Sequence, residues 1–173
     1  AVREGNEYVI NGSKMFSTNG NIANFMLVFC LTNPENPNRH KRHSFFIVET
    51  DRPGYEASKL RGKLGIRASD TAELSLNNLR VPASNLIGGE EGEGFKQVTF
   101  QFNMSRTHVC AQAVGIARAA LEEAIKYTKS RRQFGVPLSS FQVTQFKLAE
   151  MATTIRAARN LYYEAVISVD NGR

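Results

Sequence analysis

The sequence contains only two cysteines and no tryptophan, and the shortage of cysteine excludes two classes of protein. Cys30 and Cys110 each lie in an apolar stretch, and neither belongs to a CxxC pair or to a group with metal-ligand spacing. A disulfide-stabilised fold and a structural metal site are therefore not expected. We expect two free, buried thiols in a protein of a reducing compartment.

The sequence also lacks any long apolar run. A membrane-spanning helix needs about 18 or more consecutive apolar residues, and no such segment is present, so we expect no membrane span. The first ten residues, AVREGNEYVI, lack a basic segment followed by an apolar one, so they do not resemble a secretory signal. With 42% hydrophobic and 22% charged residues, the composition is that of a globular protein.

The charge balance is basic, with a formal net charge of +6. The basic residues are dispersed except in the run Arg39–His43, and no aromatic stacking motif accompanies that run. A solvated loop is the first interpretation of the run, and a phosphate-bearing ligand is the second. Nucleic acid ranks third, and we expect no nucleic-acid partner.

The first 90 residues have the pattern of short β-strands. Segments 7–10 and 13–17 flank Asn11-Gly12, which predicts a tight hairpin turn because both residues accept positive φ. The apolar run 25–32 predicts a strand that is buried on both faces. Short strands joined by turns at this spacing indicate an antiparallel β-sandwich or β-barrel. Further strands are expected at 44–50, 55–60 and 73–81.

After Pro82 the apolar residues recur at helical spacing. A glycine-rich linker, 87–94, precedes a predicted helix of about thirty residues that ends near Arg131. Ser139 and Gln142 form a capping-box pattern for a second long helix, which runs almost to the last residue. Two helices alone cannot bury both of their apolar faces, so we expect partner helices from chain outside this sequence or from another subunit.

Seven stretches together cover nearly the whole chain: YVINGSKMFSTNG, FFIVETDRPGY, KLGIRASDTAELSLNNLRVP, GEGFKQ, NMSRTHVCAQAVGIARAALEEA, SRRQFGVPLSSFQVTQFKLAEM and AARNLYYEA. Their sequences and order resemble the acyl-CoA dehydrogenase family of flavoproteins. The resemblance implies an α+β fold in which residues 1–90 form the middle β-domain, an antiparallel barrel or sandwich. Residues 91–173 would form the first two long antiparallel helices of a truncated C-terminal four-helix bundle. Family members carry a helical domain before Ala1 and two more helices after Arg173.

The resemblance implies that FAD is the cofactor and that Phe16, Ser17 and Thr18 line its flavin ring. Phe16 would cover one ring face, and Thr18 would lie near flavin N5 and O4, where a donor stabilises the reduced ring. Relatives usually have tryptophan at the position of Phe16, so the stacking surface is smaller here. On the residues alone, the alternative is a core Phe16 beside a turn capped by Ser17 and Thr18.

The resemblance also implies that Arg131 reaches the pyrophosphate of the FAD bound to a neighbouring subunit, since a guanidinium donates paired hydrogen bonds to phosphate oxygens. Gln133 and Phe134 would lie along the same cofactor, with Phe141 and Gln142 near its adenosine end. Gln142 has a competing role in the capping box, and one amide could serve both. A cation at a helix C-terminus is the plain alternative for Arg131.

Asn103, Ser105 and Arg106 resemble the family segment that holds the pantetheine and nucleotide arm of an acyl-CoA thioester. Arg106 is the strongest candidate, because a helix-borne arginine facing a cavity needs an anionic or carbonyl partner. Relatives often have aspartate at Asn103. Some carry a catalytic glutamate at the position of Ser105, whose hydroxyl cannot act as an unassisted base at neutral pH. The commoner position of the base lies beyond Arg173, so no catalytic residue is assigned and the chain alone is expected to be inactive.

The implied reaction is the FAD-dependent α,β-dehydrogenation of an acyl-CoA to the trans-2-enoyl-CoA, as in fatty-acid β-oxidation. A carboxylate takes the α-proton, and flavin N5 takes the β-hydrogen as hydride. We expect an electron-transfer flavoprotein as acceptor, a homo-oligomer (dimer or tetramer) with FAD at the subunit interface, and a location in the bacterial cytoplasm or the mitochondrial matrix. The alternatives are a non-catalytic flavin- and CoA-binding fragment or subunit, and an acyl-CoA oxidase that uses oxygen.

Overall fold

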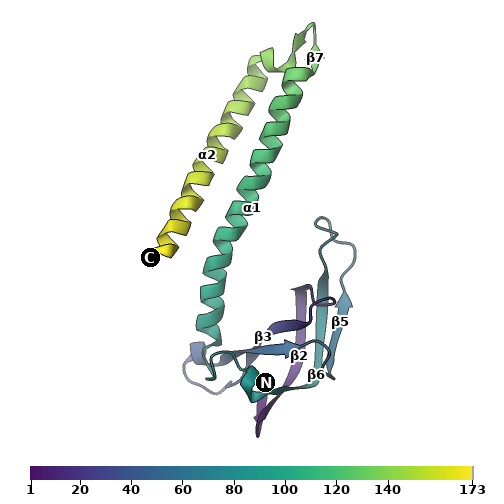
Figure 1. The fold of residues 1–173 in the computed structure, drawn as a ribbon, viewed down its shortest axis with the longest axis vertical. Helices are drawn as coiled ribbons and strands as arrows, with labels where there is room; N and C mark the ends of the chain where they lie inside the picture. The colour runs from purple at the N-terminus through teal and green to yellow at the C-terminus, as the bar shows by residue number, and fades with distance from the viewer. Residues whose placement is uncertain (173) are drawn as a thin grey trace. The chain divides into compact units, whose positions relative to one another are not determined.

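A computed structural model describes residues 1–172 of the chain, which divides into two compact units, Ala1–Thr99 and Phe100–Arg173. Strands make up most of the first unit and helices most of the second, with α1 beginning in the first unit (Figure 1). The elements are β1 (Val2–Glu4), β2 (Glu7–Thr18), β3 (Phe25–Leu31), η1 (Arg39–Lys41), β4 (His43–Glu49), β5 (Tyr55–Lys59), β6 (Thr71–Pro82), η2 (Ala83–Asn85), α1 (Gly94–Ser130), β7 (Arg132–Gln133), β8 (Val136–Pro137), η3 (Leu138–Ser140) and α2 (Gln142–Asp170).

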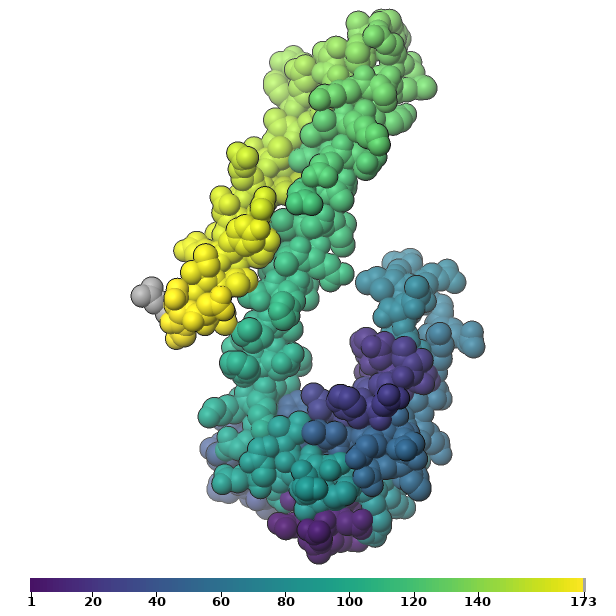
Figure 2. All heavy atoms as spheres, in the orientation of Figure 1, coloured from purple at the N-terminus to yellow at the C-terminus, as the bar shows by residue number. Residues whose placement is uncertain are grey.

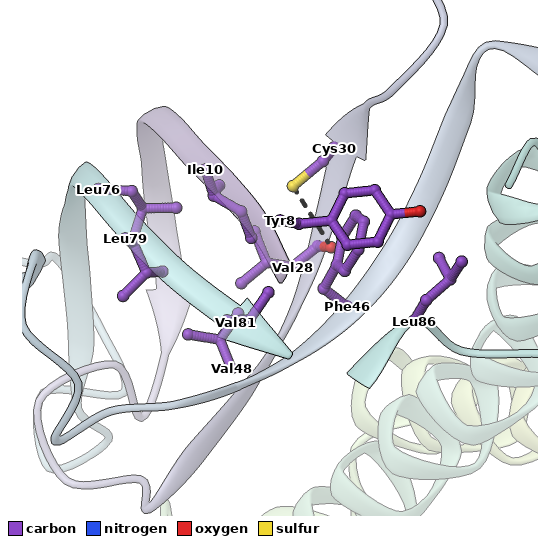
Figure 3. Packing of buried hydrophobic residues seen from close by; sticks show 10 residues of the cluster. All are labelled: Tyr8, Ile10, Val28, Cys30, Phe46, Val48, Leu76, Leu79, Val81 and Leu86. Carbon is purple, nitrogen blue, oxygen red and sulfur yellow. Dashed lines mark hydrogen bonds between the residues drawn. The ribbon is translucent and has the colours of Figure 1, made fainter. Parts of the chain in front are cut away.

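The first unit contains two antiparallel sheets that share one core. One sheet has four strands in the order β1-β2-β6-β5, and the other pairs β3 with β4. The α+β fold and the sandwich are thus confirmed, while the strands within residues 1–172 form no closed barrel. The Tyr8 hydroxyl, at the edge of this core, donates a 2.6 Å hydrogen bond to Glu91. The core residues come from both sheets and from the segment after β6 (Figure 3): Tyr8, Ile10, Val28, Cys30, Phe46, Val48, Leu76, Leu79, Val81 and Leu86.

The hairpin predicted at Asn11-Gly12 is wrong, because β2 runs unbroken from Glu7 to Thr18. The dipeptide instead lies opposite a bulge in β6, where Ile10 pairs with Leu79 but Gly12 pairs with Leu76. The Asn11 carboxamide accepts a 2.7 Å hydrogen bond from the backbone N–H of Asn78, whose φ of 49° is left-handed. The side chain of Asn11 thus stabilises a bulge, where one strand has an extra residue, rather than a reversal of the chain.

The run 25–32 was expected to be buried on both faces, and this is wrong. In β3 only Val28 and Cys30 are buried, while Phe25 and Leu27 are more than half exposed. The strand pairs with β4 alone, so only one of its faces lies against the core of the first unit. An apolar run of strand length therefore does not by itself establish burial on both faces.

The second unit holds two long helices that run antiparallel and are joined by the β7–β8 hairpin and η3. Among residues 100–172 no side chain is buried, so the apolar faces of α1 and α2 are open, as the sequence predicts.

The expectation of two buried thiols is wrong for one of them. Cys110 lies on the exposed part of α1, whereas Cys30 is buried, and both thiols are free. No helix within residues 1–172 is both long and apolar enough to cross a membrane.

Candidate functional site

The end of β2 contains a second bulge, which determines the conformation of Phe16. Lys14 pairs with Leu74 and Ser17 pairs with Ala72, so Met15 and Phe16 together lie opposite a single residue of β6. Phe16 has a φ of 59°, a left-handed conformation that is rare and costly for a bulky residue. Bulges of this kind redirect a side chain at the edge of a sheet, and they are common beside active sites.

The bulge leaves Phe16 with 74% of its surface exposed, so Phe16 is not a core residue in this unit. Ser17 is half-buried and Thr18 is exposed. Within residues 1–172, neither hydroxyl makes a hydrogen bond to another group of the protein. The strand end therefore presents an aromatic ring and two hydroxyl groups that can bind a ligand.

The turn after Thr18 is held by Asp70, a carboxylate only 6% exposed. It accepts hydrogen bonds from the backbone N–H of Asn21 at 3.0 Å and from the Asn21 carboxamide at 3.1 Å. The Asn19 N–H donates to the backbone carbonyl of Asp70 at 3.1 Å. The sequence analysis missed Asp70, because a single aspartate in a polar loop has no pattern that distinguishes it from a solvated one.

Tyr55 holds the same turn from the side. Its hydroxyl donates a 2.8 Å hydrogen bond to the carbonyl of Gly20. Burial raises the pKa of the Tyr55 phenol, and the negative charge of Asp70 raises it further. Gly20 itself fits closely against β6, since a Cβ there would lie 2.7 Å from the Cβ of Ala72. The turn thus fixes the strand end that carries Phe16, Ser17 and Thr18.

A second group of predicted residues lies at the end of the helical hairpin. Arg131 follows the last residue of α1 and is exposed, and its carbonyl accepts a 2.9 Å hydrogen bond from the N–H of Leu138. Between β7 and β8, Phe134 and Gly135 have φ values of 52° and 82°, the left-handed pair of a type I′ turn. The turn leaves Phe134 93% exposed at its tip.

Phe141 and Gln142 lie next to this turn, at the start of α2. The rings of Phe134 and Phe141 meet edge to face with centroids 6.4 Å apart. The predicted capping box is wrong: the N-cap of α2 is Phe141, without a side-chain cap, and Ser139 lies in η3. The Ser139 carbonyl accepts instead from the Gln145 carboxamide at 2.9 Å. The structure therefore brings Arg131, Gln133, Phe134, Phe141 and Gln142 together and leaves Gln142 without a capping role.

The predicted substrate residues lie on α1. Arg106 donates to the Asn103 carboxamide oxygen at 2.8 Å, across one turn of helix. The Ser105 hydroxyl donates to the backbone carbonyl of Phe102 at 3.0 Å. Arg106 borders a groove of about 450 Å³ between α1 and α2 that is otherwise lined mainly by apolar side chains, including Leu161 and Tyr162. Arg106 is the cation of this groove.

Arg106, predicted to bind the acyl-CoA, and Arg131, predicted to bind the FAD of a neighbouring subunit, lie far apart. They are separated by 25 residues, all but the last of them in α1, which at 1.5 Å per residue is about 37 Å. This exceeds the reach of one extended dinucleotide. The two arginines of one chain are therefore too far apart for a single dinucleotide to contact both.

Sequence comparison assigns both units to known domains. The profile described as "Acyl-CoA dehydrogenase, middle domain" matches residues 1–79, and "Acyl-CoA dehydrogenase, C-terminal domain" matches residues 92–173. The chain is 45% identical over 173 residues to the cyclohexane-1-carbonyl-CoA dehydrogenase of Geobacter metallireducens, covering 100% of this chain and 44% of that protein. The chain belongs to the acyl-CoA dehydrogenase family.

Solved structures of acyl-CoA dehydrogenases and related proteins share its fold. A chain in the structure of the electron transferring flavoprotein of Acidaminococcus fermentans matches with a TM-score of 0.93 and 44% identity, over 99% of this chain and 44% of that chain. A glutaryl-CoA dehydrogenase from Mycobacterium smegmatis in complex with FADH2 matches with a TM-score of 0.84 and 37% identity, over 96% and 41%. The chain thus spans less than half the length of these acyl-CoA dehydrogenase relatives.

The residues at the end of β2 fit the flavin that acyl-CoA dehydrogenases use. An exposed aromatic ring can cover a flavin face. The Ser17 and Thr18 hydroxyls can donate to a ring nitrogen or carbonyl, since no protein group within residues 1–172 uses them. The exposed Arg131 guanidinium suits a diphosphate, as an arginine fork does.

We predict that Asp70→Ala destabilises the full-length protein by about 2–3 kcal/mol, because the backbone and carboxamide N–H groups of Asn21 lose a charged acceptor. Denaturant unfolding followed by fluorescence measures this. Asp51→Ala is the matched control, since Asp51 is exposed and the change should stay within about 0.5 kcal/mol. Equal stabilities of the two variants would show that Asp70 does not hold the turn.

Proposed function

We propose that this chain is part of an FAD-dependent dehydrogenase that oxidises an acyl-CoA thioester to its trans-2-enoyl-CoA. The observation that carries the proposal is the bulge in β2, which exposes Phe16 beside the Ser17 and Thr18 hydroxyls. A strained aromatic at a strand end is costly for folding alone, and such strain is concentrated at functional sites. The acyl-CoA dehydrogenases to which the chain is related support the choice of substrate class.

The residues of β2 would bind and orient the cofactor. Phe16 would cover one face of the flavin and keep water from it, and Thr18 would donate a hydrogen bond to the ring. Bound FAD supplies the hydride acceptor for the reaction. A fixed donor would stabilise the charge of a reduced ring, and the turn anchored by Asp70 would hold that donor in place.

We propose that the residues around Arg131 bind the FAD of a neighbouring subunit. The separation of about 37 Å along α1 supports this, since the FAD that serves the Arg106 end of a chain cannot also reach Arg131 of that chain. Arg131 would bind the pyrophosphate, with Gln133 and Phe134 along the cofactor and Phe141 and Gln142 near the adenosine. The active protein would then be a homo-oligomer, a dimer or a tetramer.

The groove beside Arg106 would hold the arm of the acyl-CoA. Asn103 orients the Arg106 guanidinium through their 2.8 Å hydrogen bond, and the guanidinium offers further N–H donors to a carbonyl or phosphate oxygen. Ser105 would contact the same arm. Its hydroxyl is bonded to a helix carbonyl and is not a base, so we propose that the carboxylate base comes from outside residues 1–172.

An electron-transfer flavoprotein is the proposed acceptor, in a reaction of fatty-acid β-oxidation. The match to a chain in the structure of an electron transferring flavoprotein supports this choice. An oxidase that uses oxygen and a subunit that binds flavin and CoA without catalysis are the alternatives that the experiment below separates.

The test is to mix the flavin-loaded full-length protein anaerobically with a straight-chain acyl-CoA. We expect the flavin absorbance near the visible maximum to bleach and the enoyl-CoA, two mass units lighter, to appear by mass spectrometry. Reoxidation by an electron-transfer flavoprotein but only slowly by oxygen identifies a dehydrogenase; fast reoxidation by oxygen identifies an oxidase. Absence of bleaching with straight-chain, branched and cyclic acyl-CoA substrates would contradict the proposal.

Arg131→Ala in the full-length protein should weaken FAD retention, because a charge-assisted hydrogen bond contributes about 1.5–3 kcal/mol. Flavin content after extended dialysis measures the loss. Arg132→Ala is the matched control, since the Arg132 guanidinium donates to the carbonyl of Gly135 inside the hairpin. The same flavin content in both variants, with the oligomer intact, would show that Arg131 does not bind the cofactor.

A further inference from the structure

The loop that joins β5 to β6, residues 60–70, is closed by the side chain of Lys63. The loop extends beyond the four-stranded sheet and appears in the space-filling view as a projection of the first unit (Figure 2). Lys63 is half-buried, and its ammonium donates to the carbonyls of Ile66 at 2.9 Å and Ser69 at 2.6 Å, and to the Thr71 hydroxyl at 3.0 Å. A lysine ammonium has three N–H donors, so these acceptors use its full capacity.

These hydrogen bonds hold a backbone conformation that the residue types alone do not favour. Ile66 has a φ of 51°, an outlier for a β-branched residue. Its carbonyl accepts from the Lys63 ammonium and, at 3.1 Å, from the Ser69 N–H. At the base of the loop, the Leu60 N–H donates to the Thr71 carbonyl at 2.8 Å. Lys63 therefore joins the strained turn of the loop to the start of β6.

The segment that Lys63 holds pairs directly with the candidate flavin site. Thr71 lies opposite Thr18 in the antiparallel pairing of β2 with β6. Residues paired in this way have Cβ atoms about 4.5–5.5 Å apart on the same face of the sheet. The carbonyl of Asp70 also accepts from the Asn19 N–H at 3.1 Å. A single side chain, that of Thr71, therefore separates the Lys63 ammonium from Thr18.

Lys63 differs from the other groups that hold this strand end. Asp70 and Tyr55 bond to the turn that follows Thr18. Lys63 instead holds Thr71, the residue directly opposite Thr18. Because the Thr18 hydroxyl has no hydrogen-bond partner within residues 1–172, its position depends on the backbone that carries it and on the strand beside that backbone.

We propose that Lys63 is a positioning residue for the flavin, which by fixing Thr71 keeps the Thr18 hydroxyl where it donates to the ring. A donor that is fixed in place stabilises the added charge of a reduced ring more than a mobile donor does, because it does not need to reorganise. Loss of the Lys63 ammonium should therefore make the bound flavin harder to reduce. This inference rests on the proposed function, because it requires FAD at the end of β2.

The test measures the two-electron reduction potential of FAD bound to the full-length protein, by anaerobic equilibration with a reference dye and without acyl-CoA. Lys63→Met should lower the equilibrium constant for reduction on the order of tenfold, which corresponds to about 30 mV. Thr71→Val removes the same link without a change of charge and should lower the constant on the order of threefold. This second variant tests the proposal even if Lys63→Met fails to fold.

Lys59→Met is the matched control, because it removes the same charge from the end of β5, next to the loop. The Lys59 side chain is half-exposed, and its ammonium lies 3.9 Å from the Asp70 carboxylate. An ion pair as exposed as this contributes little to stability. The equilibrium constant for flavin reduction in Lys59→Met should therefore stay within about twofold of the native value.

A double-mutant cycle with Thr18→Val shows whether Lys63 acts through Thr18. In that background Lys63→Met should change the constant by less than about twofold, because the donor that Lys63 positions is already gone. An equal effect of Lys63→Met in both backgrounds, or an equal effect of Lys59→Met, overturns the proposal, since charge alone would then explain the shift. An unchanged potential in both Lys63→Met and Thr71→Val also overturns it. These outcomes are differences among flavin-loaded variants, whereas a native full-length protein that binds no FAD would contradict the proposed function as well.

Discussion

The antiparallel pairing of β2 with β6 is the interaction on which the rest of the first unit depends. Its regular part supplies the core residues Tyr8 and Ile10 on one strand and Leu79 and Val81 on the other. The two bulges in this pairing determine which side chains point into the core and which point away from it. Because of the bulge opposite Asn11, β6 buries side chains in the core on both sides of that bulge. The bulge at Phe16 directs its aromatic ring away from the core. Fold and candidate site therefore depend on one strand pair.

Each candidate cofactor site contains one aromatic residue with a left-handed backbone. Phe16 and Phe134 are both aromatic, both left-handed and both largely exposed, although they lie in separate units. Neither position gains stability from burying its ring in this chain. Their conformations are explained if each ring covers part of a bound cofactor, because the free energy of that contact offsets the cost of the left-handed backbone.

Much of the fold was predictable from periodicity, and the site was predictable only through family resemblance. The change from strand to helix after Pro82 and the end of α1 near Arg131 follow from residue spacing. The buried residues of β6 have even numbers up to Leu76 and odd numbers from Leu79 onward. This change indicates the bulge between them. The bulge at Phe16 has no such signal, because it depends on how many residues of β2 lie opposite β6. Asp70 was missed because its burial is set by tertiary contacts.

The most direct test of the account is the fluorescence of bound flavin when Phe16 is replaced in the full-length protein. If Phe16 covers the ring, Phe16→Ala should raise the flavin emission by exposing the ring, and Phe16→Trp should lower it, because stacked indole quenches flavin. Absorbance at equal flavin content provides the reference. An emission spectrum that is the same for the native protein and both variants would contradict the claim that the β2 bulge presents Phe16 to the cofactor.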